Sequence, residues 1–210
     1  MGTHQALGPT QRVAPTVDVW VGLVARLTAP SPDAVLAPEE LGRAAAFRDA
    51  GARARFVAGR VLLRLALGRR LGLDPRALAV EVLPGGRPVL PPRDLDFSLS
   101  HAGALVLLAV LAGAGGVGVD VERIRPLPAA ERIARTHFPP AERAAFLELP
   151  AEERGVGFFR AWTRLEARFK LDPTVDDSIV QEWVPAPGYR AAVATREPVL
   201  VRHMPPPGGD

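Results

Sequence analysis

Hydrophobic and polar positions alternate in some stretches of this chain and recur with a helical period in others. Alternation over residues 17–27 predicts a strand. A helix is expected to begin at Pro38, and a long amphipathic helix is expected over residues 53–71, where apolar residues recur every three or four positions. The arginines of the long helix are interpreted as part of its solvated face, namely Arg53, Arg60 and Arg64.

The rest of the chain follows a similar order, with strands first and helices after them. The expected strands lie at residues 79–83, 95–100, 105–112, 117–122 and 189–195, and a glycine-rich turn lies at 113–116. The expected helices lie at residues 128–137, 140–147 and 158–170. No sequence repeat accompanies this order, so any duplication would be one of architecture. The pattern indicates a mixed fold of helices and strands.

Composition narrows the class of protein. The chain has 210 residues, 48% of them hydrophobic, which is enough for one larger domain or two small halves packed closely together. No apolar run approaches the ~20 residues of a membrane-spanning helix. There is no export signal at the N-terminus and no cysteine, so we expect a cytoplasmic protein without a membrane partner. A net charge of +3, with Lys170 as the single lysine, suits an anionic ligand or an acidic partner.

Two carboxylates share one side of the strand expected at residues 117–122. Side chains alternate faces along a strand, so Asp120 and Glu122 lie together while three valines occupy the other face. A cation would relieve the repulsion between the carboxylates, and oxygen ligands at this spacing suit octahedral Mg²⁺ that also holds substrate phosphates. The same pair is common at a solvated strand end, and taken alone it favours that interpretation.

The helix expected at residues 158–170 carries a second pair of charged residues. At ~100° per residue, one apolar arc contains Phe158, Trp162, Leu165 and Phe169. Glu166 and Lys170 lie next to each other at the edge of this arc, where a core would meet a cleft. They fit a surface ion pair, or a third metal ligand followed one turn later by a phosphate-binding lysine. Position alone leaves both interpretations open.

Two other classes of function have some support in the residues. Ser100 and His101 suggest a hydrolase, but neighbours on a strand point to opposite faces and no G-x-S-x-G nucleophile elbow is present. Arginines between Arg43 and Arg70 suggest a basic nucleic-acid-binding protein, but exposed aromatic residues are not interleaved with them, and no nucleic-acid partner is expected. The remaining histidines show no ligand spacing and are assigned no role: His4, His137 and His203.

Two segments together carry a family resemblance. VGVDVERI at residues 117–124 and FRAWTRLEARFK at residues 159–170 resemble the two signature motifs of the 4'-phosphopantetheinyl transferase superfamily, in particular the surfactin-synthetase-activating (Sfp-type) enzymes. Further segments appear in the family's order: LAPEELGRAAAF at 36–47, FVAGRVLLR at 56–64, GGRPVL at 85–90, FSLSHAG at 97–103 and PGYRAAVA at 187–194. The resemblance therefore covers most of the chain between residues 36 and 194.

The resemblance implies an activity and a set of site residues. The activity is transfer of 4'-phosphopantetheine from coenzyme A to a serine hydroxyl of an apo acyl or peptidyl carrier protein, with release of 3',5'-ADP. Mg²⁺, or alternatively Mn²⁺, would be held by Asp120, Glu122 and Glu166. Glu166, directly or through a metal-bound water, is the candidate base for the serine, and Lys170 is the second catalytic residue. The residues implied to bind coenzyme A are Arg43, Arg55, Arg87, Ser100, His101, Asp120 and Lys170.

The coenzyme A contacts have different implied roles. Lys170 and His101 would contact phosphates, and Ser100 would support the nucleotide. Arg87 matches a basic family position beside the adenine nucleotide. Arg43 and Arg55 match basic positions that face the 3'-phosphate.

The fold implied by the resemblance is α+β. It has two similar halves in one chain, a pseudo-dimeric arrangement in which each half is a small antiparallel sheet packed with a long helix. The halves are expected at residues 1–113, with the nucleotide contacts, and 114–210, with the metal site and the catalytic helix. One chain would then be complete as a monomer, with its active site in the cleft between the halves.

Two departures from the family pattern leave an alternative open. Leu165 stands where family members usually have a lysine directly before the helix glutamate. After Lys170, about sixteen residues lead to the segment that begins at Pro187, where the family usually has a longer stretch. A degenerate homologue that binds coenzyme A or a carrier protein without efficient transfer would fit both departures.

Overall fold

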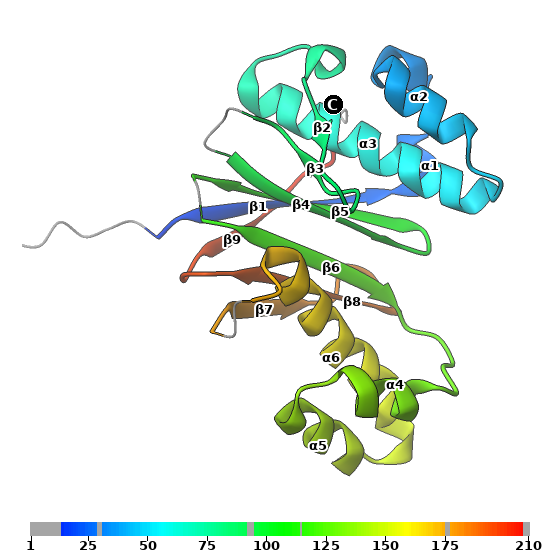
Figure 1. Ribbon diagram of the computed structural model, residues 1–210, viewed down its shortest axis with the longest axis vertical. Helices are drawn as coiled ribbons and strands as arrows, with labels where there is room; N and C mark the ends of the chain where they lie inside the picture. Colours follow the sequence, from blue (N-terminus) through cyan, green and yellow to red (C-terminus); the bar gives the residue numbers. More distant parts are fainter. Residues whose placement is uncertain (1–13, 29–30, 92–94, 114, 175–176, 208–210) are drawn as a thin grey trace, which may run out of the picture.

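Two β-sheets pack face to face, and helices cover their outer sides (Figure 1). The computed structural model describes residues 14–28, 31–91, 95–113, 115–174 and 177–207. The fold is α+β, as the sequence predicts.

The first sheet has four strands in the order β4-β5-β1-β9. Their bounds are Leu95–Ala102 for β4, Leu105–Ala112 for β5, Thr16–Leu23 for β1 and Leu200–Met204 for β9. The pairs β4–β5 and β5–β1 are antiparallel, but β9 runs parallel to β1. The first sheet is therefore mixed, where an antiparallel sheet was expected.

The second sheet has three antiparallel strands in the order β6-β8-β7. Their bounds are Val117–Arg123 for β6, Tyr189–Thr195 for β8 and Ile179–Trp183 for β7. A small separate hairpin consists of β2 at Glu81–Val82 and β3 at Pro88–Val89. The turn of this hairpin carries Arg87 to the site described below.

The helices divide between the two sheets. On the side of the first sheet lie α1 at Val24–Leu27, α2 at Pro38–Ala45 and α3 at Ala50–Leu71, with short 3₁₀ turns at Pro32–Ala34 and Pro75–Ala77. On the side of the second sheet lie α4 at Ala130–His137, α5 at Pro140–Glu148 and α6 at Ala151–Leu171. Each sheet thus carries one long helix, α3 or α6 (Figure 1).

Several boundaries differ from the sequence prediction. The first strand ends at Leu23 rather than at residue 27, because the chain turns there into the short helix α1. The helix expected at 158–170 begins seven residues earlier, at Ala151, directly after Pro150. Phe169, expected in the apolar arc of that helix, is 62% exposed, because the last turn of α6 borders a cavity instead of the core.

The interpretation of the arginines on the long helix as a solvated face is wrong for two of the three. Arg60 and Arg64 are only 4% and 2% exposed, whereas Arg53 is exposed. Arg64 donates from Nε to Glu40 of α2 at 2.5 Å and from Nη1 to three backbone carbonyls around the 3₁₀ turn after α3. Burial is tolerated because the guanidinium is both paired and hydrogen-bonded.

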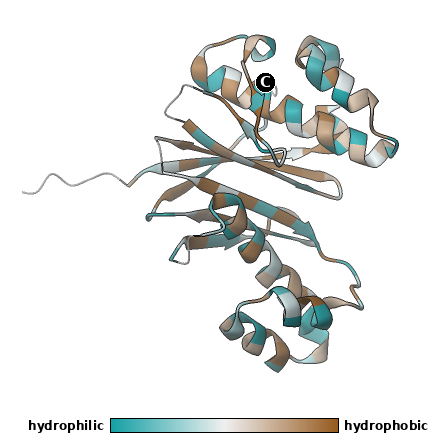
Figure 2. Ribbon diagram, viewed as in Figure 1, coloured by the Kyte–Doolittle hydropathy of each residue, from teal (hydrophilic) through white to brown (hydrophobic). Residues whose placement is uncertain are grey.

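A hydrophobic layer joins the two sheets. The alternating valines of β6, Val117, Val119 and Val121, are at most 1% exposed and pack with residues of β1, β5 and β8. Figure 2 shows these strands as largely hydrophobic. Because the valines face the first sheet, the other side of β6 faces α6, and Asp120 and Glu122 lie on that side.

Candidate functional site

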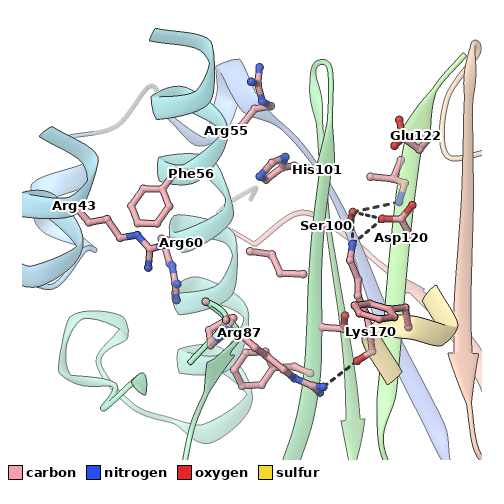
Figure 3. Close-up of a pocket in the computed structure, with 18 residues that line it drawn as sticks. Arg43, Arg55, Phe56, Arg60, Arg87, Ser100, His101, Asp120, Glu122 and Lys170 are labelled. Atoms are coloured by element: carbon pink, nitrogen blue, oxygen red, sulfur yellow. Dashed lines mark hydrogen bonds and ion pairs between the residues drawn. The ribbon is translucent and has the colours of Figure 1, made fainter. Parts of the chain in front are cut away.

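A cavity of about 550 Å³ opens where the edge of the first sheet meets the edge of the second (Figure 3). Its walls come from α2, α3, the turn between β2 and β3, strands β4 and β6, and the end of α6. One wall carries arginines and the opposite wall carries Asp120 with Lys170 (Figure 3). All but one of the predicted site residues line this cavity; Glu166 is the exception.

Asp120 is the centre of the acidic wall. Its side chain is nearly buried, and its Oδ1 accepts hydrogen bonds from Ser100 Oγ at 2.8 Å and from Lys170 Nζ at 2.6 Å. Lys170 Nζ also donates to Ser100 Oγ at 3.0 Å. The other oxygen, Asp120 Oδ2, is buried and has no hydrogen-bond partner among the residues that the structure describes. An unpaired carboxylate oxygen in this position is a free ligand for a cation.

Gly118 allows α6 to lie directly against β6. A side chain at Gly118 would overlap the backbone of Ala167 and Leu171, so α6 can approach β6 this closely only because residue 118 is glycine. This close approach sets Lys170 of α6 beside Asp120 of β6. The glycine therefore helps to assemble the acidic wall.

Glu122 and Glu166 lie near Asp120 and respond to its charge. Burial raises the pKa of Glu122, and the Asp120 charge raises it further, although a hydrogen bond from Arg125 opposes both effects. Burial, followed by repulsion from Asp120, also raises the pKa of Glu166. The charge of Asp120 thus disfavours the charged forms of Glu122 and Glu166, and a divalent cation would reverse this effect.

The predicted metal ligands have the chemistry that Mg²⁺ requires, but they are not gathered into a preformed site. Among the described residues, no three His, Asp or Glu side chains converge closely enough to hold a metal ion. Lys170 supplies the positive charge that balances Asp120 in this structure. A cation would give Asp120 Oδ2 a partner and would stabilise the charged forms of Glu122 and Glu166, whose pKa values are raised. The assignment of the ligand set stays a prediction.

Arg60 belongs to the arginine wall of the cavity, although the sequence did not predict it as a site residue. The guanidinium groups of Arg43 and Arg60 lie 5.4 and 5.5 Å from the ring centre of Phe56, within cation–π range. Arg60 lines the cavity, and within the described part of the chain its buried Nη1 has no hydrogen-bond partner. Its nearest carboxylate, Glu40, is 3.8 Å away. Burial lowers the pKa of Arg60, and an anion in the cavity would oppose that effect.

A signal for Arg60 was present in the sequence. Arg60 follows Phe56 by four positions, so the two side chains are neighbours on one face of the helix. Phe56 is one of the apolar residues that recur along this helix, and Arg60 lies one helical turn after it. Phe56 is only half-buried and lines the cavity with Arg60.

Arg55 and His101 lie at the same end of the cavity (Figure 3). Arg55 is 3.9 Å from Asp49. Burial lowers the pKa of His101, with smaller contributions from the positive charges of Arg55 and Lys170. Ser100 bonds to Asp120 and Lys170, so the hydroxyl serves the acidic wall and no serine–histidine hydrogen bond is formed within the described residues.

Arg87 connects the small hairpin to the end of α6. Its Nη1 donates to the backbone carbonyl of Lys170 at 2.9 Å, and its Nη2 donates to Asp96 Oδ1 at 3.0 Å. The guanidinium is therefore engaged with the end of α6 while one side of it borders the cavity. Its predicted contact with the adenine nucleotide stays a prediction.

The lining of the cavity suits a multiply phosphorylated ligand, since arginines face a lysine and carboxylates of the kind that hold a metal ion. The family model described as the 4'-phosphopantetheinyl transferase superfamily matches residues 116–177, the stretch that contains the acidic wall. A relative from Salmonella typhimurium, the 4'-phosphopantetheinyl transferase AcpT, is 33% identical over 72% of this chain and 72% of its own length. The chain therefore belongs to the 4'-phosphopantetheinyl transferase superfamily, as its motifs predicted.

Two cyanobacterial proteins are also similar to the chain. The 4'-phosphopantetheinyl transferase HetI of Nostoc sp. is 38% identical over 65% of this chain and 59% of its own length. A protein of Synechocystis sp., named a putative 4'-phosphopantetheinyl transferase, is 30% identical over 74% of this chain and 64% of its own length. The chain thus spans about three fifths of the length of these two relatives.

Among the helices that the structure describes, none combines the length and the apolar composition that a membrane span requires.

Proposed function

We propose that this protein transfers 4'-phosphopantetheine from coenzyme A to a serine hydroxyl of an apo carrier protein and releases 3',5'-ADP. The observation that carries the proposal is the cluster of Asp120, Lys170 and Ser100 on one wall of a cavity whose other wall presents arginines. Arg43 and Arg60, with Arg55 nearby, suit the phosphates of the nucleotide.

The reaction is a displacement at the pyrophosphate of coenzyme A. The serine oxygen attacks the phosphorus that carries the pantetheine, the bond from this phosphorus to the bridging oxygen breaks, and 3',5'-ADP leaves with the electron pair. Glu166 accepts the proton of the serine in this proposal, and the burial that raises its pKa makes the carboxylate a stronger base. Lys170 offsets the charge on the leaving phosphate. Mg²⁺ held by Asp120, Glu122 and Glu166 would neutralise charge on the pyrophosphate when bound.

The proposed architecture is that of two similar halves meeting at the cavity, with a boundary near residues 113–116. Each sheet with its long helix would form one half, and the nucleotide contacts would lie mainly in residues 1–113 and the metal ligands in 114–210. The final strand β9 returns to the first sheet, so the two parts are also joined at the other end of the chain. A monomer acting in the cytoplasm on an acyl or peptidyl carrier protein follows from this proposal.

A degenerate homologue remains the second candidate, and the structure weakens one reason for it. Leu165, which replaces a lysine of the family pattern, packs against the aromatic cluster around Phe158 and Phe138. The substitution is therefore accommodated in a core instead of leaving a gap in the cavity wall. The short stretch after Lys170 still contains the strand β7 at the outer edge of the second sheet.

Intact-mass measurement of an apo carrier protein tests the proposal. Incubation with this protein, coenzyme A and Mg²⁺ is expected to add the mass of one phosphopantetheine, and several carriers of the fatty-acid, polyketide and nonribosomal-peptide types are compared. Asp120→Ala is expected to abolish the gain while the variant stays folded by circular dichroism, because the carboxylate serves the site. Binding of coenzyme A without any mass gain would instead support the degenerate homologue.

A further inference from the structure

The outer strands of the two sheets, β4 and β6, run side by side at the cavity without a backbone ladder between them. In the described chain, β4 pairs through its backbone with β5, and β6 pairs with β8. The two strands nevertheless lie close along their length. Edge strands leave backbone N–H groups that need partners when buried.

Side chains of β4 satisfy the open edge of β6. Three alternate side chains of β4 accept hydrogen bonds from three alternate backbone N–H groups of β6, and each donor follows its acceptor by 21 positions in the sequence. The bonds are Val117 N–H to Asp96 Oδ2 at 3.2 Å, Val119 N–H to Ser98 Oγ at 3.0 Å, and Val121 N–H to Ser100 Oγ at 3.3 Å. We call this set of three bonds the side-chain seam. Because the offset is constant, the two strands run parallel in a single register.

The side-chain seam spans the position of Asp120 in β6. Asp120 sits between the N–H groups of Val119 and Val121, which are held by Ser98 and Ser100. Sliding β6 by one residue would move the carboxylate by about 3.3 Å and turn it to the other face of the strand. The contact of Asp120 with Ser100 and Lys170 depends on this register.

Ser98 accepts the middle one of the three hydrogen bonds in the side-chain seam. Its side chain is 7% exposed, and its bond to Val119 is formed between buried atoms. Ser100 also bonds to Asp120 and Lys170, and Asp96 also bonds to Arg87, so substitutions there would change two things at once. Within the described residues, Ser98 makes no other side-chain hydrogen bond, so it is the seam position at which the register is tested. Ser98 also lines the cavity, so the affinity for coenzyme A is measured in the same variants.

We propose that Ser98 is a positioning residue, whose hydroxyl oxygen fixes the register of β6 and thereby the place of Asp120 in the site. The part of this proposal that concerns catalysis rests on the transferase function proposed above, whereas the part that concerns the strand register does not. Loss of the hydroxyl would leave the buried Val119 N–H without an acceptor and free β6 to shift.

Two substitutions at Ser98 with side chains of nearly equal shape separate the effect of the hydroxyl group from the effect of side-chain volume. Ser98→Thr keeps an oxygen that can accept the bond, and Ser98→Val replaces it with a methyl group. Hydrogen exchange of the Val119 amide, followed by NMR in the ligand-free protein, is expected to be about tenfold faster or more in Ser98→Val than in Ser98→Thr. Ser98→Ala gives a smaller replacement if the valine variant does not fold.

The catalytic arm measures transfer and coenzyme A affinity in the same variants. Ser98→Val is expected to lower kcat by about tenfold or more through misplacement of Asp120, with little change in the Kd for coenzyme A, and Ser98→Thr is expected to restore kcat. Thr195→Val is the control, since it removes a buried hydroxyl of the second sheet that bonds to the Glu197 carbonyl, away from β4. It should leave kcat and Val119 exchange unchanged.

Distinct results would overturn the proposal. Equal Val119 exchange in Ser98→Val and Ser98→Thr would show that the hydroxyl does not hold the strand. A large loss of coenzyme A affinity with unchanged kcat and exchange would show that Ser98 instead contacts the ligand. If the wild-type protein transferred nothing, the proposed function would fail, and the exchange measurement alone would still decide whether Ser98 sets the register.

Discussion

At the scale of single residues, the two positive charges of the buried Arg60 and Arg64 exceed the single negative charge of Glu40, the carboxylate beside them. Arg64 Nε lies 2.5 Å from Glu40 Oε2, whereas Arg60 Nη1 lies 3.8 Å from Glu40 Oε1 and has no hydrogen-bond partner among the described residues. A buried guanidinium in this state lacks both a full counter-charge and a hydrogen-bond acceptor. A phosphate in the cavity would supply both.

Arg60→Gln is expected to weaken coenzyme A binding by about tenfold or more, since a hydrogen bond to a charged group contributes about 1.5–3 kcal/mol. Isothermal titration at two salt concentrations measures the loss, and the salt dependence of binding should fall as well. Arg53→Gln is the control, because Arg53 lies on the same helix but is exposed and away from the cavity. Equal affinity of Arg60→Gln and Arg53→Gln would remove Arg60 from the binding wall.

Arg87→Lys tests whether the shape of the side chain matters beyond its charge. The guanidinium bridges the Lys170 carbonyl and Asp96 through two different nitrogens, and an ammonium group cannot reproduce that geometry. We expect Arg87→Lys to lower kcat by several-fold, because the end of α6 that carries Lys170 is less firmly held. Initial transfer rates measure the effect, and wild-type rates in this variant would mean that charge alone is required.

At this scale, the sequence predicted the acidic wall better than the basic one. Alternation along one strand was enough to place Asp120 opposite the valines, since the period of a strand is fixed by geometry. The burial of Arg60 and Arg64 depends on Glu40 in another helix, and no pattern within the long helix reveals that partner. The serine hydroxyl of Ser98 was missed for the same reason, because its partner belongs to a strand 21 positions away.

At the scale of elements, the close contact of β6 with α6 is the feature on which the acidic wall depends. Gly118→Ala is expected to lower the free energy of unfolding by about 1–3 kcal/mol, because the added methyl group would overlap backbone that cannot move alone. The same change should slow transfer by separating Asp120 from Lys170. Urea denaturation and initial rates measure the two effects.

Gly155→Ala provides the matched control for Gly118→Ala. Gly155 lies in α6, and a methyl group added there would meet no atom within 4 Å. Alanine is favoured over glycine in a helix by about 0.5–1 kcal/mol, so this variant should be as stable as the wild type or more stable. A Gly118→Ala protein as stable and active as Gly155→Ala would contradict the importance of the close approach.

Long, strongly patterned elements were predicted, and short ones were not. The strands expected at 105–112 and 189–195 have the bounds of β5 and β8, and the helix expected at 53–71 begins three residues after the start of α3. The second long helix was also predicted, but its expected start lies seven residues after the start of α6. The strands β7 and β9 have five residues each, and the sequence analysis contained neither. β9 is held by pairing with β1 at the other end of the chain, which no local pattern shows.

At the scale of the whole molecule, Asp18 ties the first strand to a helix and to the last strand. Its carboxylate is 2% exposed and accepts from Arg70 of α3 and from Arg202 of β9 at 2.6 Å. Arg70 is 28% exposed and Arg202 is 57% exposed, so water screens the Arg202 pair more strongly. The Arg70 pair should therefore contribute more to stability.

Replacing the two arginines that contact Asp18 is expected to lower the free energy of unfolding more than replacing Asp18 itself. Replacing both Arg70 and Arg202 with alanine leaves Asp18 buried and unpaired, for a loss of about 3–5 kcal/mol in the free energy of unfolding. Asp18→Asn leaves two arginines that can reach water, for a loss of about 1.5–3 kcal/mol. Urea denaturation at neutral pH compares the variants, and Arg70→Ala should exceed Arg202→Ala. The opposite order would show that screening does not govern these pairs.

The parallel pairing of β1 with β9 also governs when the protein can finish folding during synthesis. As the chain leaves the ribosome, β1, β4 and β5 can associate early, but the outer edge of β1 stays open until residues 200–204 emerge. Asp18 has no Arg202 beside it during that interval. The nascent chain therefore exposes an unpaired edge strand between the synthesis of β1 and that of β9, which is the period in which chaperones would protect it from aggregation.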